Sequence, residues 1–358
     1  MKILIFYTHN QGYLSGFFKE ISSRLSSEEH QVFNFSFKGK KDSAEFDGVK
    51  LFIEKKSGYI NNYLHVYRII KKIKPDVIIS NFSYVNPALF FGKFFGVKNN
   101  LAWSHSLNVQ MESSKSNILI KRYFLKLADI VIANSILTEK ELHTSYALAE
   151  SKTKVIPFWT NIIENKGKLM TGNFGNQSKA VKIGCPGRLK HHKNQQVVIK
   201  ALSRIMNNGQ DNFILYIVGN GETIKELKEL VCKSNLDYKV KFISNLSVDE
   251  MIDFYKSMDV IVLPSLHEAF GLVLIETLAL GTPVLVSSRF GALSFIHEDK
   301  NNLLSEITFN PNSVDSLTQK LALYFKGTPI KKEYIRELYL ENFNKENIYS
   351  DLKKIILR

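Results

Sequence analysis

Residues 259–287 constrain the fold more than any other part of the sequence. A continuous apolar run at 260–263 is typical of a parallel strand buried on both faces. A polar turn follows, and then apolar residues recur at helical spacing until Gly281-Thr282-Pro283 ends the helix before another apolar run. The stretch therefore predicts a strand–loop–helix–strand unit of an α/β sheet, with Glu268 on the loop and Glu276 inside the helix.

Similar alternation of strands and helices occurs in both halves of the chain, which predicts parallel, doubly wound sheets. The expected strands are 3–7, 31–37, 49–53, 77–80, 101–105, 130–133, 154–157, 181–185, 213–218, 240–243, 260–263 and 284–286. We expect an α/β protein with two Rossmann-like domains facing across a cleft. The first would span 1–163 and the second 180–340, joined by a linker at 164–179, with a helix at 341–358 that can cross back to the first domain.

Composition narrows the classes of function. The chain has 358 residues and a formal net charge of +14, which suits nucleic acid, an anionic membrane or phosphorylated ligands. A Lys-rich codon bias would explain the charge without any partner. The two cysteines lie far apart in sequence, which fits a reducing cytoplasm, and no apolar stretch is long enough to span a bilayer.

Two carboxylates on this loop and helix can hold hydroxyl groups at two points of one extended ligand. The alternative is a solvated loop acid and an ordinary exposed helical Glu. The whole run from Asp259 to Ser287 resembles the Glu-x7-Glu signature of the retaining family 4 glycosyltransferases, which have the GT-B fold. The resemblance implies that Glu276 binds the ribose hydroxyls of a nucleotide sugar. It also implies that Glu268 contacts the transferred sugar as a catalytic residue.

Other parts of the second half follow the same family. The resemblance implies that the backbone of Phe270, Gly271 and Leu272 lies beside the donor, with Gly271 at a helix start that favours anions. Arg188 and Lys193, in the loop after the strand at 181–185, match the family's residues that bind the nucleotide diphosphate. A basic loop that is merely solvated is the alternative. Gly219 belongs to a Gly-x-Gly turn that borders the nucleotide in the family, although plain turn chemistry explains it equally well.

The first half matches the family more loosely. Gly12 lies in the first strand–helix turn, where the family has glycines facing the acceptor or the donor phosphates, but the spacing is not Gly-x-Gly-x-x-Gly. His105 ends the strand at 101–105, and the family places a His near the transferred sugar there. Ser106 departs from the family's His-Asp pair. We expect this domain to bind the acceptor, and His105 to be catalytic rather than structural.

The chemistry implied by the resemblance needs no metal and no cofactor. The sequence contains no Asp-x-Asp, so nothing indicates a carboxylate-held divalent cation. Basic residues and a helix N-terminus would stabilise the leaving diphosphate instead. The family transfers sugar with retention of configuration, and the departing phosphate takes the acceptor proton.

A basic, helix-like stretch at 115–127 suggests contact with an anionic membrane surface. Its charges are Lys115, Lys121, Arg122 and Lys126, and the alternative is an ordinary surface helix. We therefore expect a UDP- or GDP-sugar donor and a glycan acceptor linked to a polyprenyl diphosphate. The chain would be a hexosyl- or N-acetylhexosaminyltransferase of bacterial cell-surface polysaccharide synthesis, cytoplasmic and peripheral on the inner face of the membrane.

Two other interpretations remain open. A nucleotide-sugar 2-epimerase would use two Rossmann-like halves without an acceptor, although the Glu268-to-Glu276 spacing belongs to the transferase signature. A non-catalytic nucleic-acid binder would explain the charge, but no such motif is present and aromatics do not alternate with basic patches. We therefore expect no nucleic-acid partner.

Overall fold

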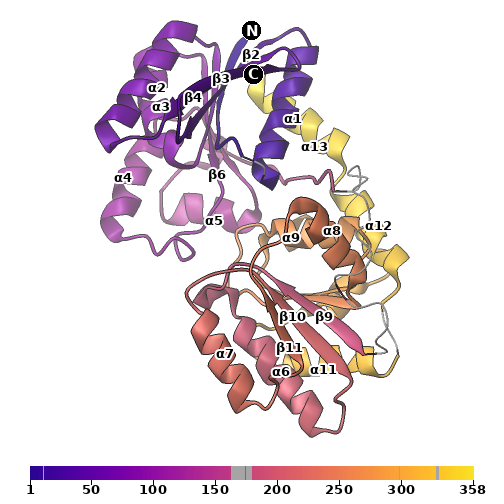
Figure 1. The fold of residues 1–358 in the computed structure, drawn as a ribbon. Helices are drawn as coiled ribbons and strands as arrows, with labels where there is room; N and C mark the ends of the chain where they lie inside the picture. The colour runs from indigo at the N-terminus through magenta and orange to yellow at the C-terminus, as the bar shows by residue number, and fades with distance from the viewer. Residues whose placement is uncertain (11, 163–173, 175–179, 298, 328–329) are drawn as a thin grey trace. The chain divides into compact units, whose positions relative to one another are not determined.

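The chain forms two compact units (Figure 1). The computed structural model describes residues 1–10, 12–162, 174, 180–297, 299–327 and 330–358. Unit 1 comprises Met1–Trp159 and Lys345–Arg358, and unit 2 comprises Thr160–Asn344. The linker expected at 164–179 lies outside the described residues except for Phe174, which packs on Tyr216 and Phe254 of unit 2.

Unit 1 is built on an eight-stranded sheet in the order β3-β4-β2-β1-β5-β6-β7-β8. Its strands are β1 (Lys2–Phe6), β2 (Gln31–Lys38), β3 (Asp42–Phe46), β4 (Val49–Lys55), β5 (Val77–Asn81), β6 (Asn99–Ser104), β7 (Ile130–Ala133) and β8 (Thr153–Val155). All neighbours pair in parallel except β3 and β4. Because the parallel strands are covered on both faces, their sequences are rich in apolar residues, which made most of them predictable from the sequence.

Helices cover both faces of this sheet. They are α1 (Tyr13–Ser27), α2 (Tyr59–Ile73), α3 (Val85–Phe94), α4 (Lys115–Leu125), α5 (Ile136–Thr144) and α13 (Lys345–Ile356). One face is covered by α2 and α3, whose Val66, Ile70 and Ala88 pack on Leu4 and Ile78. Helix α1 packs its phenylalanines against Trp103, on the other face of the sheet.

The sequence pattern missed strand β3. Residues 42–46 do not alternate between apolar and polar side chains, because four of the five are exposed. The sequence therefore shows no strand pattern there. The readable signal was Asp47-Gly48, a two-residue turn in which both residues have positive φ (48° and 72°), as a type I′ hairpin requires. The hairpin pairs Phe46 with Val49 and adds a short, charged antiparallel edge to the sheet.

Unit 2 has a fully parallel six-stranded sheet in the order β11-β10-β9-β12-β13-β14. Its strands are β9 (Val181–Pro186), β10 (Phe213–Val218), β11 (Val240–Ile243), β12 (Val260–Leu263), β13 (Val284–Ser287) and β14 (Thr308–Phe309). Its helices are α6 (Gln195–Asn207), α7 (Ile224–Lys233), α8 (Val248–Ser257), α9 (Leu272–Ala279), α10 (Leu303–Ile307), α11 (Val314–Phe325) and α12 (Lys332–Asn342). Both units are thus Rossmann-like, and the α/β class predicted from the sequence is confirmed.

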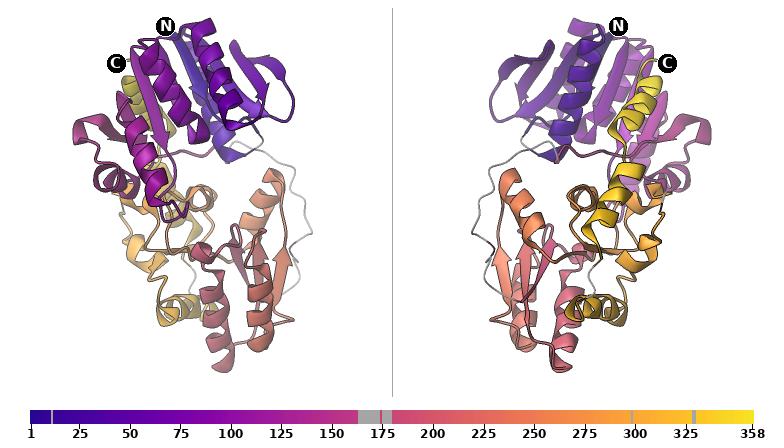
Figure 2. Two further views of the ribbon diagram at one scale, coloured as in Figure 1. Left: turned by 90° about the vertical axis from the view of Figure 1, so that its left-hand side faces the viewer. Right: turned by 90° about the vertical axis from the view of Figure 1, so that its right-hand side faces the viewer.

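The C-terminal helix α13 belongs to unit 1, although the helix before it in the chain belongs to unit 2 (Figures 1 and 2, yellow). Asn99 at the start of β6 donates its side-chain amide to the carbonyls of Ile355 (2.8 Å) and Ile356 (3.1 Å). Arg24 of α1 forms a two-pronged ion pair with Glu346 (2.7 and 2.8 Å). The end of the chain is therefore fixed to the sheet of unit 1 by hydrogen bonds as well as by apolar packing.

Replacing Asn99 with Ala should lower the stability of unit 1 by about 1–3 kcal/mol, because two carbonyls of α13 lose their donor. Both tryptophans, Trp103 and Trp159, are buried in unit 1, so urea denaturation followed by tryptophan fluorescence reports on that unit. The matched control is Asn208→Ala, at an exposed position of unit 2. An unchanged midpoint for Asn99→Ala would show that α13 is held by its apolar residues alone.

Candidate active site

The candidate site in unit 2 lies where the strand order reverses. Strand β9 pairs with β10 on one side and with β12 on the other, and the loops after β9 and β12 leave the sheet at the same edge. In open α/β sheets, ligands bind outside the carboxyl ends of the strands at such a point. Three of the residues predicted from the sequence, Arg188, Lys193 and Glu268, lie on these two loops.

Direct contacts join the two loops. The backbone N–H of Leu266 donates to the carbonyl of His192 (2.8 Å), and the side chain of Asn194 donates to the carbonyl of Pro264 (3.2 Å). Lys193 forms an ion pair with Glu268, and both side chains are largely buried (19% and 14% exposed). The structure therefore brings together a basic and an acidic residue that are far apart in the sequence.

The loop that carries Glu268 is fixed at several points. The backbone N–H of Glu268 donates to the carbonyl of Arg289 (3.2 Å), and the carbonyl of Glu268 accepts from the N–H of Gly291 (3.0 Å). Gly271 begins α9 with φ of +101°, and a Cβ there would lie 2.3 Å from the ring of Phe290. Any other residue would be strained at this φ and would clash with Phe290. The backbone conformation at the N-cap of α9 therefore requires glycine.

Glu276 lies one turn further into α9 and accepts a hydrogen bond from the hydroxyl of Tyr255 (2.8 Å). Burial raises the pKa of the Glu276 carboxyl to about 7, and the Tyr255 hydrogen bond lowers it in part. A carboxyl held half-charged near neutral pH is a strong acceptor for ligand hydroxyls once it is ionised. Perturbed carboxyls of this kind are enriched at functional sites.

The other site residues predicted in the second half, Phe270, Leu272 and Gly219, differ in their burial and packing. The Phe270 side chain is buried against Phe295 and Phe343, and its carbonyl accepts a hydrogen bond from the N–H of Ala292 (2.8 Å). Leu272 is the half-buried first residue of α9. Gly219 is explained by packing, because a Cβ there would lie 2.1 Å from the carbonyl oxygen of Gly187.

Arg188 is exposed, and no described acidic side chain forms an ion pair with its guanidinium. Its backbone is held by Gln195, whose side chain donates to the Arg188 carbonyl (3.1 Å). This edge of unit 2 thus carries the exposed guanidinium of Arg188 and, in its ion pair with Glu268, the largely buried ammonium of Lys193.

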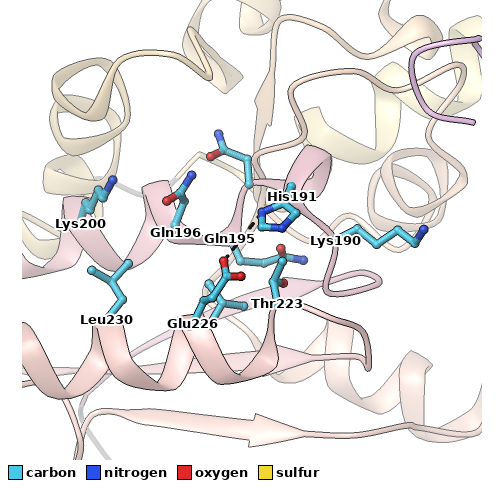
Figure 3. A pocket seen from close by; sticks show the side chains of 10 residues that line it. Lys190, His191, Gln195, Gln196, Lys200, Thr223, Glu226 and Leu230 are labelled. Carbon is cyan, nitrogen blue, oxygen red and sulfur yellow. Dashed lines mark ion pairs between the residues drawn. The ribbon is translucent and has the colours of Figure 1, made fainter. Parts of the chain in front are cut away.

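A small pocket lies beside this loop, between the starts of α6 and α7 (Figure 3). Its volume is about 180 Å³, below the roughly 300–1,000 Å³ of typical small-molecule sites. Glu226 points toward His191 across it, with 3.8 Å between a Glu226 carboxylate oxygen and Nδ1 of His191, whereas Lys190 points away (Figure 3). The pocket therefore offers no clear anion site of its own.

In unit 1, His105 is held as a neutral ring. Its Nε2 lies 2.7 Å from Oδ1 of Asn81, and because the Asn81 amide nitrogen donates to a strand carbonyl, His105 must donate from Nε2. The ring stacks with Phe82 and Trp103, at centroid distances of 4.5 and 5.8 Å. Burial and, to a smaller extent, the charge of Lys121 together lower the pKa of His105 to about 3. His105 is therefore suited to accept a hydrogen bond at Nδ1, which has no described partner, rather than to transfer a proton.

Gly12 caps the start of α1 in an extended conformation. Its N–H already donates to the side chain of Asn10 (2.7 Å). The turn is therefore closed by its own side chain, and the Gly12 N–H is not a spare donor for a phosphate.

The prediction that Lys121 of α4 contacts an anionic membrane surface together with Lys115, Arg122 and Lys126 needs correction. Lys115 and Lys126 are exposed and Arg122 is half-buried, but Lys121 turns inward and lies 4.8 Å from the ring centroid of Tyr146. Burial lowers the pKa of Lys121, and Glu141 opposes that shift. The apolar residues of the helix also do not share one buried face, because Leu119, Ile120 and Tyr123 are exposed whereas Leu125 is buried.

No group of three or more His, Cys, Asp or Glu side chains in the described ranges is arranged to hold a metal ion. We expect turnover to persist in EDTA, because Arg188, Lys193 and the N-terminus of α9 supply the positive charge that a divalent cation would otherwise provide. Nucleotide release measured with EDTA and with added Mg²⁺ or Mn²⁺ checks this. Strict dependence on the added ion would contradict it.

Two residues at these sites were not found from the sequence. Tyr255, the partner of Glu276, lies on α8, and Asn81, the partner of His105, ends β5. Neither belongs to a motif, and only the tertiary structure brings them to their partners. Asn81 had a weak signal, since it is a polar residue ending an apolar strand at the same edge as His105.

Comparisons with known proteins agree with this arrangement. The family description "Glycosyl transferases group 1" matches residues 171–339, and "Glycosyltransferase Family 4" matches residues 17–161. An uncharacterized glycosyltransferase of Methanocaldococcus jannaschii is 31% identical over 180 residues, which are 48% of this chain and 46% of that protein. Protein CapJ of Staphylococcus aureus is 26% identical over 87% of this chain and 71% of its own length.

The solved structure of Anabaena HepE in complex with UDP-glucose has a similar fold. It is 17% identical with a TM-score of 0.74, covering 99% of this chain and 98% of that one. The fold of this chain is GT-B, and the chain belongs to the family 4 glycosyltransferases. The match spans about half the length of the Methanocaldococcus relative. Among the described residues, no helix is both long and apolar enough to cross a membrane.

Proposed function

We propose that this chain is a retaining glycosyltransferase that moves a hexosyl or N-acetylhexosaminyl group from a UDP- or GDP-sugar to a lipid-linked glycan acceptor. The observation that carries the proposal is the Lys193–Glu268 pair at the switch point of unit 2, with Arg188 beside it and Glu276 further along α9. The pair of matching family descriptions and the UDP-glucose complex of HepE support a nucleotide-sugar donor. The lipopolysaccharide outer core galactosyltransferase WaaB, which has a similar fold, supports a role in cell-surface polysaccharide synthesis.

Each residue has one part in the reaction. Glu276 accepts the ribose hydroxyls, and Arg188 and Lys193 neutralise the diphosphate. As the bond between the sugar C1 and the diphosphate oxygen breaks, its electron pair stays on the diphosphate, where these cations stabilise it. Glu268 lies beside Lys193 and supports the positive charge that develops on the sugar. The acceptor oxygen then bonds to C1 on the same face, and its proton passes to the departing diphosphate.

A donor screen tests the proposal. The purified chain is incubated with a panel of UDP- and GDP-sugars, with and without a lipid extract of bacterial membranes, and released nucleoside diphosphate is measured. One donor should give release that increases strongly with the extract. Epimerised donor formed without any acceptor would favour a 2-epimerase instead, and no release from any donor would contradict the proposal.

A further inference from the structure

The outer face of α2, α3 and α4 in unit 1 exposes an unusual number of large apolar side chains. Helix α2 packs against α3 and α3 against α4, so the three lie side by side, toward the left of unit 1 in Figure 1 and toward the viewer in the left view of Figure 2. The exposed residues are Tyr59, Ile60, Leu64, Phe90, Phe94, Phe95, Leu119, Ile120 and Tyr123. Ile60 and Phe94 are 74% and 70% exposed. We call this surface, formed by residues 59–73, 85–95 and 115–126, the aromatic–basic face.

Aromatic rings connect α2 and α3 without a break. Tyr63 of α2 lies 6.4 Å from Phe91 of α3, and Tyr67 lies 5.4 Å from both Phe91 and Phe95. Tyr59 extends the series at one end, 4.6 Å from Tyr63. The apolar side chains of α2 and α3 are therefore continuous with one another, and a contiguous exposed apolar surface marks a contact site for a protein or a membrane.

The charge of the same face is of one sign. None of the three helices contains an Asp or a Glu. Their basic residues are Arg68, Lys71, Lys72, Lys93, Lys115, Lys121 and Arg122. All of these except Lys121 and Arg122 are exposed. Arg68 and Lys72 also line a pocket with Asp42 of β3 and Glu54 of β4. Elsewhere on the three helices, exposed aromatic and aliphatic side chains among lysines fit the interface of an anionic bilayer, where rings sit at the headgroup level and lysines reach the phosphates.

We propose that the aromatic–basic face is a docking surface for an anionic lipid bilayer, centred on α2 and α3 rather than on the lysines of α4. A second copy of this chain fits less well, because it would place like charges opposite one another. The proposal goes beyond the transfer reaction, since docking on a bilayer requires no turnover. In the setting of the proposed function, it brings unit 1 to an acceptor that is linked to lipid.

Vesicle flotation tests this proposal. Wild type should float with vesicles of equal parts phosphatidylcholine and phosphatidylglycerol at low salt, be released at high salt, and not float with phosphatidylcholine alone. Lys71→Glu/Lys93→Glu should weaken binding at least about 25-fold, since each basic residue near the surface contributes about fivefold. Ile60→Ser/Phe94→Ser should weaken it at least about tenfold, because two exposed apolar anchors are lost.

Matched controls separate this face from general charge and hydrophobicity. Leu323→Ser/Leu340→Ser and Lys225→Glu/Lys233→Glu change exposed residues of unit 2 in the same way and should bind like wild type. Equal binding by the face variants and the controls would overturn the proposal, as would a wild type that never floats. Self-association through the face, detected as a size shift that Ile60→Ser/Phe94→Ser abolishes, would overturn it as well. Donor turnover with a detergent-solubilised acceptor should be retained in all four variants, so a failure of docking and a failure of the proposed function are distinguishable.

Discussion

Lys193→Ala should lower kcat/KM by about a hundredfold and Arg188→Ala by about tenfold. Each variant would lose the charge-assisted contact to the diphosphate that we propose for this residue, worth about 1.5–3 kcal/mol. Lys193 has the larger effect because its loss also leaves Glu268 without the ion pair that Lys193 supplies, close to a leaving group that is itself negative. Steady-state nucleotide release over a range of donor concentrations measures both effects.

The matched control for these two variants is Lys190→Ala. Lys190 lies on the same loop, but its side chain points away from the neighbouring pocket residues (Figure 3). We expect its kcat/KM to stay within about twofold of wild type, as for a surface ion whose contribution is small. A loss as large as that of Lys193→Ala would mean that the loop acts through its net charge rather than through defined contacts.

Donor affinity should depend on pH through Glu276. In the proposed function the ionised carboxylate accepts the ribose hydroxyls. Burial raises its pKa to about 7, so below this pH the carboxyl must lose a proton before it binds in that way. The affinity for UDP should therefore fall by about tenfold for each pH unit below about 7 and stay constant above it. Titration calorimetry across this range measures the change.

Two variants test the assignment to Glu276. Glu276→Gln should bind UDP about ten- to a hundredfold more weakly than wild type at pH 8, and its affinity should not vary with pH. Tyr255→Phe removes the hydrogen bond that lowers the Glu276 pKa, so its pH-dependent limb should move to higher pH. Equal affinities and equal pH profiles in all three proteins would place the ribose elsewhere.

Much of the fold could be predicted because parallel strands that are buried on both faces appear in the sequence as short apolar runs. The strand at 260–263 and the helix that follows it were expected within a residue or two of β12 and α9. Strand β3 was not expected, since an exposed edge strand has no apolar pattern and only its Asp-Gly turn marks it. Helix α4 was expected, but its periodicity did not show which of its residues face the unit, because apolar residues lie on both its inner and its outer side.

Part of the candidate site could also be predicted from the sequence, but for a different reason. Residues such as Glu268 and Glu276 share one local motif, so their spacing alone relates them. The pairing of Lys193 with Glu268, and of Glu276 with Tyr255, joins residues on different elements, and no local pattern reports such contacts. The inward turn of Lys121 toward Tyr146 likewise depends on the position of the segment that follows α5. The charge pattern of a sequence shows how many lysines a helix has, but not which of them turn away from the solvent.

The fate of the sugar in a reaction with an isotopically labelled nucleotide-sugar tests the central claim most directly. With the donor identified by nucleotide release and the lipid extract as acceptor, the label should appear on the lipid-linked product in an amount equal to the nucleoside diphosphate released. Its anomeric configuration, determined by NMR, should be that of the donor. Label that remains on the nucleotide as an epimer, is found only as free sugar, or reaches the acceptor with inverted configuration would contradict the account.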